Sequence, residues 1–262
     1  MILFQNYPKK QNDMKRSLKN IKDYSIECLD GIKGNIKDLL FDEDSWIIRY
    51  IEADFKDQDF GSRVLIPRFH LNKPDWENRT FHLNLDKPEI KASPTLEEAT
   101  PVSREFEKRL AEHYNIEPYW PYIPAVPAGN YYPTRPLQVP TKEIHEEDLD
   151  TSLRSFEEVR TYRIHGTDGH MGQVEDIIVD DRDWQIIYLI VDTSIWLPWS
   201  KKVVLSIDWL TKISYVHKHV SIELNKEQIK NAPEFDPSHP IDMDYEKALD
   251  AYFKDQIIHT TS

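Results

Sequence analysis

Two long apolar stretches of the chain have the same pattern, and each is interrupted by a short acidic turn. In VEDIIVDDRDWQIIYLIVD (174–192), runs of β-branched and aromatic residues lie on both sides of DRD. Residues of these types favour strands, and aspartate-rich turns between such runs are typical of β-hairpins. The stretch IKDLLFDEDSWIIRYIEAD (36–54) has the same pattern. The sequence therefore predicts two similar hairpins that lie far apart in the chain.

The second hairpin belongs to a longer series of short elements. Further strands are expected at TYRIH (161–165), KKVVLSI (201–207) and, as a hairpin about HK, ISYVHKHVSIEL (213–224). Two helices are expected after them, at 225–230 and 242–253. Asn225 and Gln228 have the spacing of a capping box at the start of the first helix. Short strands followed by two short helices predict a small β-barrel or a strongly curled sheet.

The similarity of the hairpins is part of an internal repeat. A shift of 138 residues aligns identical residues at eight of 24 consecutive positions. The identical pairs are Gly31/Gly169, Gly34/Gly172, Asp38/Asp176, Asp42/Asp180, Trp46/Trp184, Ile48/Ile186, Tyr50/Tyr188 and Asp54/Asp192. A shift of 139 then aligns 84–94 with 223–233 and 101–114 with 240–253. Matches in the same order over most of two segments indicate a duplication.

The repeat predicts the domain organisation. Two units are expected at 17–114 and 152–253, flanked by tails at 1–16 and 254–262. The connector (115–151) holds seven of the chain's 17 prolines. Proline fixes φ and has no backbone donor, so the connector should be extended and without regular secondary structure. Its aromatic residues favour a connector packed on the units; a proline-rich ligand for a partner domain is the alternative.

The order of motifs in these units resembles the PRC-barrel family. The shared pattern is glycine-x-x-glycine, VED, an apolar run, an acidic turn, tryptophan, IIYLIVD, WLP and KKVVLS. This family is named for the cytoplasmic domain of the photosynthetic reaction centre H subunit, and the tandem is similar to a bacterial group of double PRC-barrel proteins. The resemblance implies a mainly β fold with short helices (α+β), built as two small PRC-barrel-like β-barrels in a pseudo-symmetric tandem.

Two departures from the family limit what the resemblance implies. The first unit has FKDQDFGSRV (55–64) where the second has TSIWLPWSKKV (193–203), so a surface built on the WLP segment is expected once. The membrane helix of the reaction-centre subunit has no counterpart here, which weakens a photosynthetic role. A similar barrel in the ribosome maturation factor docks on a ribosomal protein, so the resemblance also implies protein binding.

The net charge and the cysteine content of the chain limit the kinds of molecule that it is expected to bind and the compartment in which it is expected to lie. The formal net charge of −13 disfavours nucleic acid and anionic membrane surfaces, because no basic face is evident to contact phosphates. One cysteine, Cys28, excludes an internal disulfide and suits a reducing compartment. No window has the roughly 18 to 20 apolar residues that a membrane-spanning helix needs. A cytoplasmic protein is therefore expected.

The repeated acids are the first candidate for chemistry. Asp38, Asp42 and Asp54 recur in the second unit, but hairpin turns and strand ends favour aspartate for its hydrogen bonds to backbone. A structural role is therefore predicted for the repeated residues rather than an acid/base pair. The predicted repeat-structural set is Gly31, Gly34, Asp38, Trp46, Asp54, Gly169, Gly172, Asp176, Trp184 and Asp192.

The histidines and the cysteine are the second candidate. HGTDGH (165–170) and HKH (217–219) place four histidines near predicted turns, and zinc needs three or four convergent ligands. The first unit has no histidines at the matching positions, so loop and edge residues are the favoured interpretation. Cys28 is expected to be a buried thiol. We assign no catalytic residue, cofactor-binding residue or metal ligand, and the sequence favours a protein that is not an enzyme.

Three tryptophans of the second unit are the remaining candidates for a functional surface. Trp196, Trp199 and Trp209 cluster in SIWLPWSKKVVLSIDWL (194–210), and large aromatics are enriched at binding hot spots. These three residues are the candidate partner surface. The function expected is a non-catalytic adaptor or scaffold that binds another protein; a homodimer is a further arrangement considered. The alternative is a small-molecule or metal-binding sensor that uses the cleft between the two units.

Overall fold

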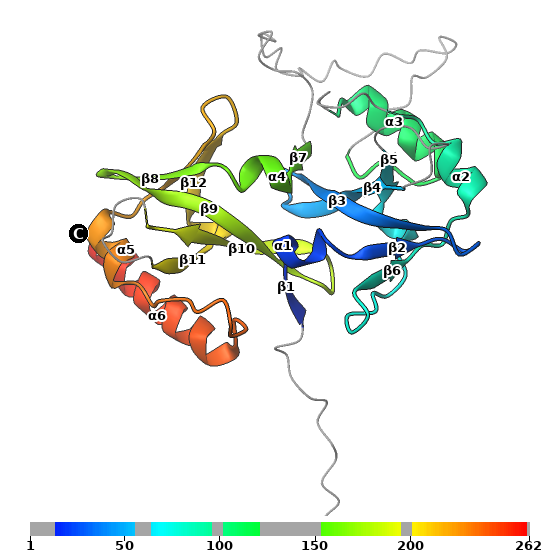
Figure 1. The fold of residues 1–262 in the computed structure, drawn as a ribbon. Helices are drawn as coiled ribbons and strands as arrows, with labels where there is room; N and C mark the ends of the chain where they lie inside the picture. The colour runs from blue at the N-terminus through cyan, green and yellow to red at the C-terminus, as the bar shows by residue number, and fades with distance from the viewer. Residues whose placement is uncertain (1–13, 56–63, 96–101, 121–152, 195–200, 261–262) are drawn as a thin grey trace, which may run out of the picture.

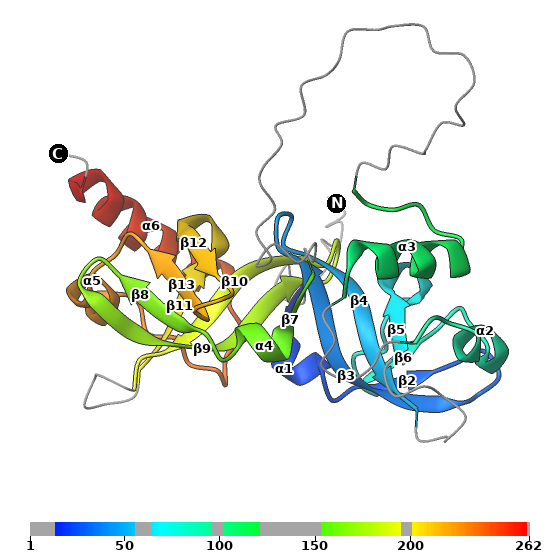
Figure 2. The same cartoon turned by 90° about the horizontal axis from the view of Figure 1, so that it is seen from above.

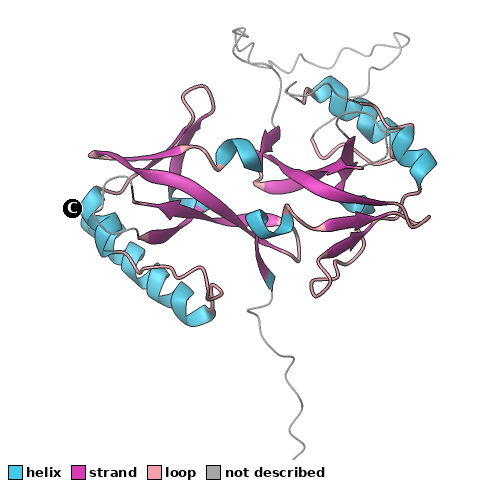
Figure 3. Cartoon of the chain, in the orientation of Figure 1, coloured by secondary structure: helices cyan, strands magenta, loops and turns pink. Residues whose placement is uncertain are grey.

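The protein is mainly β, with short helices at the periphery of a curled sheet (Figure 3). The computed structural model describes residues 14–55, 64–95, 102–120, 153–194 and 201–260, with only the backbone helix described for 255–260. The predicted mainly β fold with a curled sheet and short helices is confirmed.

The first unit, as the term is used from here on, comprises the elements before residue 114. They are β1 (Lys15–Ser17), α1 (Leu18–Ile21), β2 (Ser25–Glu27), β3 (Lys33–Asp42), β4 (Ile47–Asp54), β5 (Val64–Pro67), η2 (Arg68–His70), β6 (Thr80–His82), α2 (Lys87–Lys91) and α3 (Arg104–His113).

The second unit contains the same series of elements with one more strand. They are β7 (Leu153–Ser155), α4 (Phe156–Val159), β8 (Arg163–Gly166), β9 (Gly169–Asp180), β10 (Gln185–Asp192), β11 (Lys202–Ser206), η3 (Ile207–Trp209), β12 (Leu210–Ser214), β13 (His219–Ile222), α5 (Lys226–Asn231) and α6 (Met243–Thr260). Isolated bridges in the first unit, Leu71↔Leu83 and Asp75↔Thr80, stand where β12 pairs with β13.

The local predictions for these elements are confirmed. The two long hairpins are β3–β4 and β9–β10, and Asn225 and Gln228 form a capping box at the start of α5. The expected tails differ from the structure at both ends. Strand β1 begins at Lys15, inside the predicted tail 1–16, and α6 continues to Thr260, inside the predicted tail 254–262.

All the strands of the described residues belong to one sheet, whose path is β12-β13-β8-β9-β10-β4-β3-β2-β6. The two units meet at the middle of this path, where β10 pairs with β4 at Gln185↔Ile47. Two backbone hydrogen bonds reinforce the junction: Ile48 donates to the carbonyl of Trp184 at 3.0 Å, and Ile186 donates to that of Trp46 at 2.7 Å. The backbone carbonyl of each repeated tryptophan thus accepts a hydrogen bond from the other unit. Figure 1 shows the second unit on the left and the first on the right.

The first strand of each unit leaves its own unit and joins the other. Strand β1 pairs with β9, and β7 pairs with β3, both antiparallel. The short helices α1 and α4 follow these strands and lie in the middle of the molecule, between the two sets of long strands (Figures 1 and 2). Sequence reasoning did not predict these arms. Each unit is therefore completed by a strand from its neighbour in the chain.

The repeated tryptophans also pack on the core. Both have positive φ, 57° for Trp46 and 65° for Trp184, at the last position of the hairpin turn. The Trp46 ring stacks on Phe41 at 5.4 Å, whereas Trp184 lies 5.7 Å from Phe81 of the other unit. Both tryptophans are partly buried and pack against the hydrophobic core.

The repeated glycines Gly34 and Gly172 allow the strand ends of each hairpin to approach closely. A Cβ on Gly172 would lie 2.4 Å from the carbonyl oxygen of Asp192, and one on Gly34 would lie 2.7 Å from that of Asp54. Gly172 also has φ of +150°. Gly31 has a positive φ of +82°, but its missing Cβ faces open space. The second glycine of each repeat is therefore required by packing, and Gly31 by conformation.

We expect Gly172→Ala to lower the free energy of unfolding by about 2–4 kcal/mol, because the new methyl group meets backbone in a conformation that L-residues avoid. Gly31→Ala is the control and should cost about 1–2 kcal/mol, from the backbone conformation alone. Chemical denaturation followed by tryptophan fluorescence measures both. Equal losses for the two variants would contradict the steric argument.

Candidate functional site

The repeated aspartates Asp38 and Asp176 lie inside strands, where each receives the arm of the other unit. The hydroxyl of Ser155 donates to Asp38, and the backbone N–H of Glu157 donates to the same carboxylate at 3.2 Å. Asp38 accepts a third bond from its neighbour Leu39 at 2.8 Å. The carboxylate of β3 thereby fixes the start of α4.

The second unit repeats this contact in the opposite direction. The hydroxyl of Ser17 donates to Asp176 at 2.5 Å, and the backbone N–H of Lys19 donates to it at 3.1 Å. Each serine also caps its short helix: Asn20 donates to Ser17 and Glu158 donates to Ser155, both at 3.1 Å. We call the set Ser17, Ser155, Asp38 and Asp176 the inter-unit clasp.

Burial changes the acidity of the clasp. Asp38 is only 7% exposed, and burial raises its pKa to about 6, with a smaller contribution from Glu52 on the paired strand. The hydrogen bonds from Ser155, Leu39 and Glu157 oppose this shift. Burial likewise raises the pKa of Asp176. Perturbed carboxyls often indicate active sites, but structural networks perturb them as well, and here both oxygens already bind protein donors.

The other repeated acids serve turns. Asp42 accepts hydrogen bonds from the backbone and hydroxyl of Ser45, at 2.9 and 2.6 Å. Asp180 forms an ion pair with Arg182 at 2.5 Å. The side chain of Asp192 accepts from the backbone of Ser194 at 2.8 Å, and Asp54 is exposed. The side chains of these acids therefore do not converge on a common point.

Ion pairs surround the clasp. Arg16 of β1 contacts Asp181 at 2.8 Å, and its repeat equivalent Arg154 contacts Glu43 at 2.6 Å. Lys19 contacts Glu175 at 3.1 Å.

At the equivalent positions of the second arm, the signs of the charges are exchanged. Glu157 stands where Lys19 stands, and Lys37 stands where Glu175 stands. Glu157 pairs with Lys22 at 2.6 Å.

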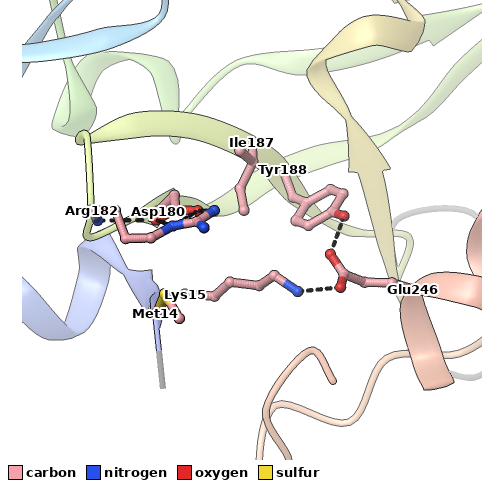
Figure 4. A pocket seen from close by; sticks show the side chains of 7 residues that line it. All are labelled: Met14, Lys15, Asp180, Arg182, Ile187, Tyr188 and Glu246. Atoms are coloured by element: carbon pink, nitrogen blue, oxygen red, sulfur yellow. Dashed lines mark hydrogen bonds and ion pairs between the residues drawn. The ribbon is translucent and has the colours of Figure 1, made fainter. Parts of the chain in front are cut away.

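A pocket of about 240 Å³ lies where the N-terminal arm passes the second unit (Figure 4). It is lined by Met14, Lys15, Asp180, Arg182, Ile187, Tyr188 and Glu246. Glu246, near the start of α6, accepts a hydrogen bond from the hydroxyl of Tyr188 at 2.6 Å and an ion pair from Lys15 at 2.5 Å. The ionisable groups are thus paired, Lys15 with Glu246 and Arg182 with Asp180, and the pocket combines apolar walls with two carboxylates and two cations.

The first unit contains the repeat equivalent of this tyrosine–glutamate pair. Glu107 of α3 is fully buried and hydrogen bonds with Tyr50. It also accepts from Arg104 at 3.1 Å and from the hydroxyl of Tyr119 at 2.9 Å. Burial raises the pKa of Glu107 to about 7, against the opposing effect of Arg104.

The histidines of the second unit form a row rather than a ligand set. His165 lies 5.6 Å from His170 and 4.9 Å from His219, and His217 lies 6.1 Å from His219, between ring centroids. Burial lowers the pKa of His165, His170 and His219, with the neighbouring cations adding to the effect. Within the described ranges, no three His, Cys, Asp or Glu side chains are placed to hold a metal ion.

The candidate partner surface is described only in part. Trp196 and Trp199 lie outside the described residues. Trp209 is half-buried and packs on Phe253 of α6, with ring centroids 4.2 Å apart. Cys28 is buried, and burial raises the pKa of its thiol to about 11, which leaves it a poor nucleophile at neutral pH.

Comparison with protein-family models and with curated proteins finds no match for this chain. None of the helices in the described residues is long and apolar enough to cross a membrane.

Sequence reasoning missed Ser17, Ser155 and the pair of Tyr188 and Glu246. The serines carried a signal, since Arg-Ser before an apolar residue recurs at the repeat distance of 138. The glutamate carried one as well, because Glu246 aligns with Glu107 at the shift of 139. Neither signal reveals that the contacts of the serines cross from one unit to the other.

The clasp predicts a specific pH dependence. Because the pKa of Asp38 is raised above its unfolded value of about 3.9, the folded protein binds the proton more tightly. The resulting stabilisation is complete below the unfolded pKa and is lost as pH rises through about 6. Relative to Asp38→Asn, which cannot take up this proton, the wild type should gain about 1–1.5 kcal/mol between pH 7.5 and pH 5.

Urea unfolding of both proteins at several pH values measures this difference. Using the Asn variant as reference cancels the titration of distant groups, including Asp176. A difference in unfolding free energy that stays constant from pH 7.5 to pH 5 would contradict the raised pKa.

Proposed function

We propose that this chain is a non-catalytic adaptor or scaffold of the PRC-barrel type that binds another protein through the surface of one unit. The observation that carries the proposal is the inter-unit clasp. Four side chains of the clasp and two tryptophan carbonyls join the units at several points. The two units therefore keep a fixed spacing, which a scaffold needs and which a pair of freely linked modules lacks.

The partner surface we propose is the segment that carries Trp196 and Trp199, together with Trp209. The described residues that flank this segment are firmly held. Thr193 donates to the carbonyl of Lys201 through its backbone at 3.0 Å and its hydroxyl at 2.7 Å.

The flanking residue Lys201 is anchored in turn to the end of α5. Its ammonium donates to the carbonyls of Lys230 and Ala232, at 2.6 and 2.5 Å. A cation that binds the last carbonyls of a helix is favourably placed with respect to the helix dipole. The residues on both sides of the tryptophan segment, Thr193 and Lys201, are therefore held in place by hydrogen bonds.

A small-molecule sensor is the second candidate, and the pocket in Figure 4 is where a small ligand would bind. The pocket lies between the arm of the first unit and the body of the second, and its volume of about 240 Å³ is below the roughly 300–1,000 Å³ typical of drug-sized ligands. A ligand retained through purification would support this candidate.

If the protein is an adaptor, it should capture a partner protein, and this capture should depend on Trp196 and Trp199. The tagged full-length protein would be used for affinity capture from its native cells, with chemical crosslinking and mass spectrometry. We expect the wild type to capture one or two specific proteins. The double variant Trp196→Ala/Trp199→Ala should enrich these proteins about tenfold less than the wild type, because hot-spot aromatics contribute about 2 kcal/mol or more each to binding.

The matched control is Phe69→Ala, which removes an aromatic side chain that is 65% exposed on the first unit. It should capture the same partners as the wild type. All variants are first checked for wild-type melting temperature. Partners retained equally by the double variant would move the surface elsewhere, and the absence of any specific partner would reject the adaptor in favour of the sensor.

A further inference from the structure

The two units carry equivalent tyrosine–glutamate pairs, and within the described residues a later segment of the chain covers only the pair of the first unit. Tyr50 and Glu107 in the first unit align with Tyr188 and Glu246 in the second. The cavities beside the two pairs share two lining positions, Arg49/Ile187 and Tyr50/Tyr188. The remaining cavity is about 10 Å³ in the first unit and about 240 Å³ in the second.

In the first unit the occupant is the chain just after α3. Tyr119 lies with its ring 3.9 Å from the guanidinium carbon of Arg49, and its hydroxyl donates to Glu107 at 2.9 Å. Arg104 donates to the same hydroxyl at 2.8 Å and lies over Trp120 at 4.6 Å. The Pro-Tyr-Trp segment is therefore bound by stacking on cations and by two charge-assisted hydrogen bonds at the Tyr119 hydroxyl.

In the second unit the chain takes a different course at the equivalent point. Tyr119 corresponds to residue 258, which still lies within α6, so the chain does not turn back toward Glu246 at this point as it does after α3 in the first unit. In the second unit Lys15, on the N-terminal arm, supplies the cation that Arg104 supplies in the first. The ammonium of Lys15 lies 2.5 Å from the carboxylate of Glu246. Glu246 keeps acceptor capacity, because a carboxylate has about four lone-pair sites and these contacts use two.

We infer that the pocket beside Tyr188 and Glu246 binds a tyrosine-bearing extended segment of a partner protein, in the way that the first unit binds Tyr119. In this arrangement the ring of the partner's tyrosine packs against Ile187 and Lys15, which line the pocket in Figure 4, and its hydroxyl donates to Glu246. A volume of this size accommodates one large side chain, not a cofactor. The inference rests on the proposed adaptor function and names a second contact for the same partner class.

The probe is the first unit's own segment as a free peptide, acetyl-EPYWP-amide (117–121), labelled with a fluorophore. Fluorescence anisotropy with the full-length protein measures its binding. We expect saturable binding that weakens about tenfold when the peptide tyrosine is replaced by phenylalanine, because the hydrogen bond to a charged acceptor is lost. Replacement by alanine should abolish binding.

Variants of the second unit locate the site. Ile187→Arg introduces the guanidinium that stacks on Tyr119 in the first unit, and it should tighten binding roughly two- to fivefold. Glu246→Gln should weaken binding about tenfold. Asp244→Asn, whose side chain is 93% exposed near the start of α6, is the matched control and should leave the affinity unchanged.

Three results would overturn the inference. They are no saturable binding to the full-length protein, binding that none of the variants in the second unit alters, and binding that appears only after removal of residues 1–13. The last result would assign the pocket to the chain's own N-terminal segment, which contains Tyr7. Failure of the peptide with successful capture of a partner by the tryptophan segment would reject this pocket and keep the adaptor.

Discussion

The structure depends on the exchange of one short arm between two similar units. A three-residue strand followed by a one-turn helix is too short to be stable alone. Here each arm gains stability from the long hairpin of the other unit, through strand pairing and through a buried carboxylate that holds its capping serine. Because each unit supplies what the other lacks, the core of either unit is complete only when both are folded.

The chemistry of the clasp explains why aspartate recurs at these two positions. A buried carboxylate is costly unless donors surround it, and each of these accepts three hydrogen bonds. A neutral apolar residue would pack more cheaply but would leave the serine and the helix start without an acceptor. A polar contact of this kind fixes one arrangement of the arm, whereas apolar packing tolerates several.

Sequence patterns predicted the elements well and the connections between them poorly. The hairpins follow from β-branched runs and acidic turns, and the capping box of α5 follows from the spacing of Asn225 and Gln228. Those features are local in the chain. The arms have few apolar residues, and their partners lie more than 100 residues away, so no local pattern reveals them. The pocket was missed for the same reason: Lys15, Tyr188 and Glu246 come from three distant segments.

The exchanged charges beside the clasp have a consequence for recognition between the units. Lys19 faces Glu175, while the other arm carries Glu157 and the other hairpin carries Lys37. Two copies of the first unit joined in this way would place lysine against lysine, and two copies of the second would place glutamate against glutamate. Like charges penalise both of those pairings, whereas the unlike pair avoids the penalty. At this position the charges of the two units therefore favour pairing of unlike units over pairing of like units.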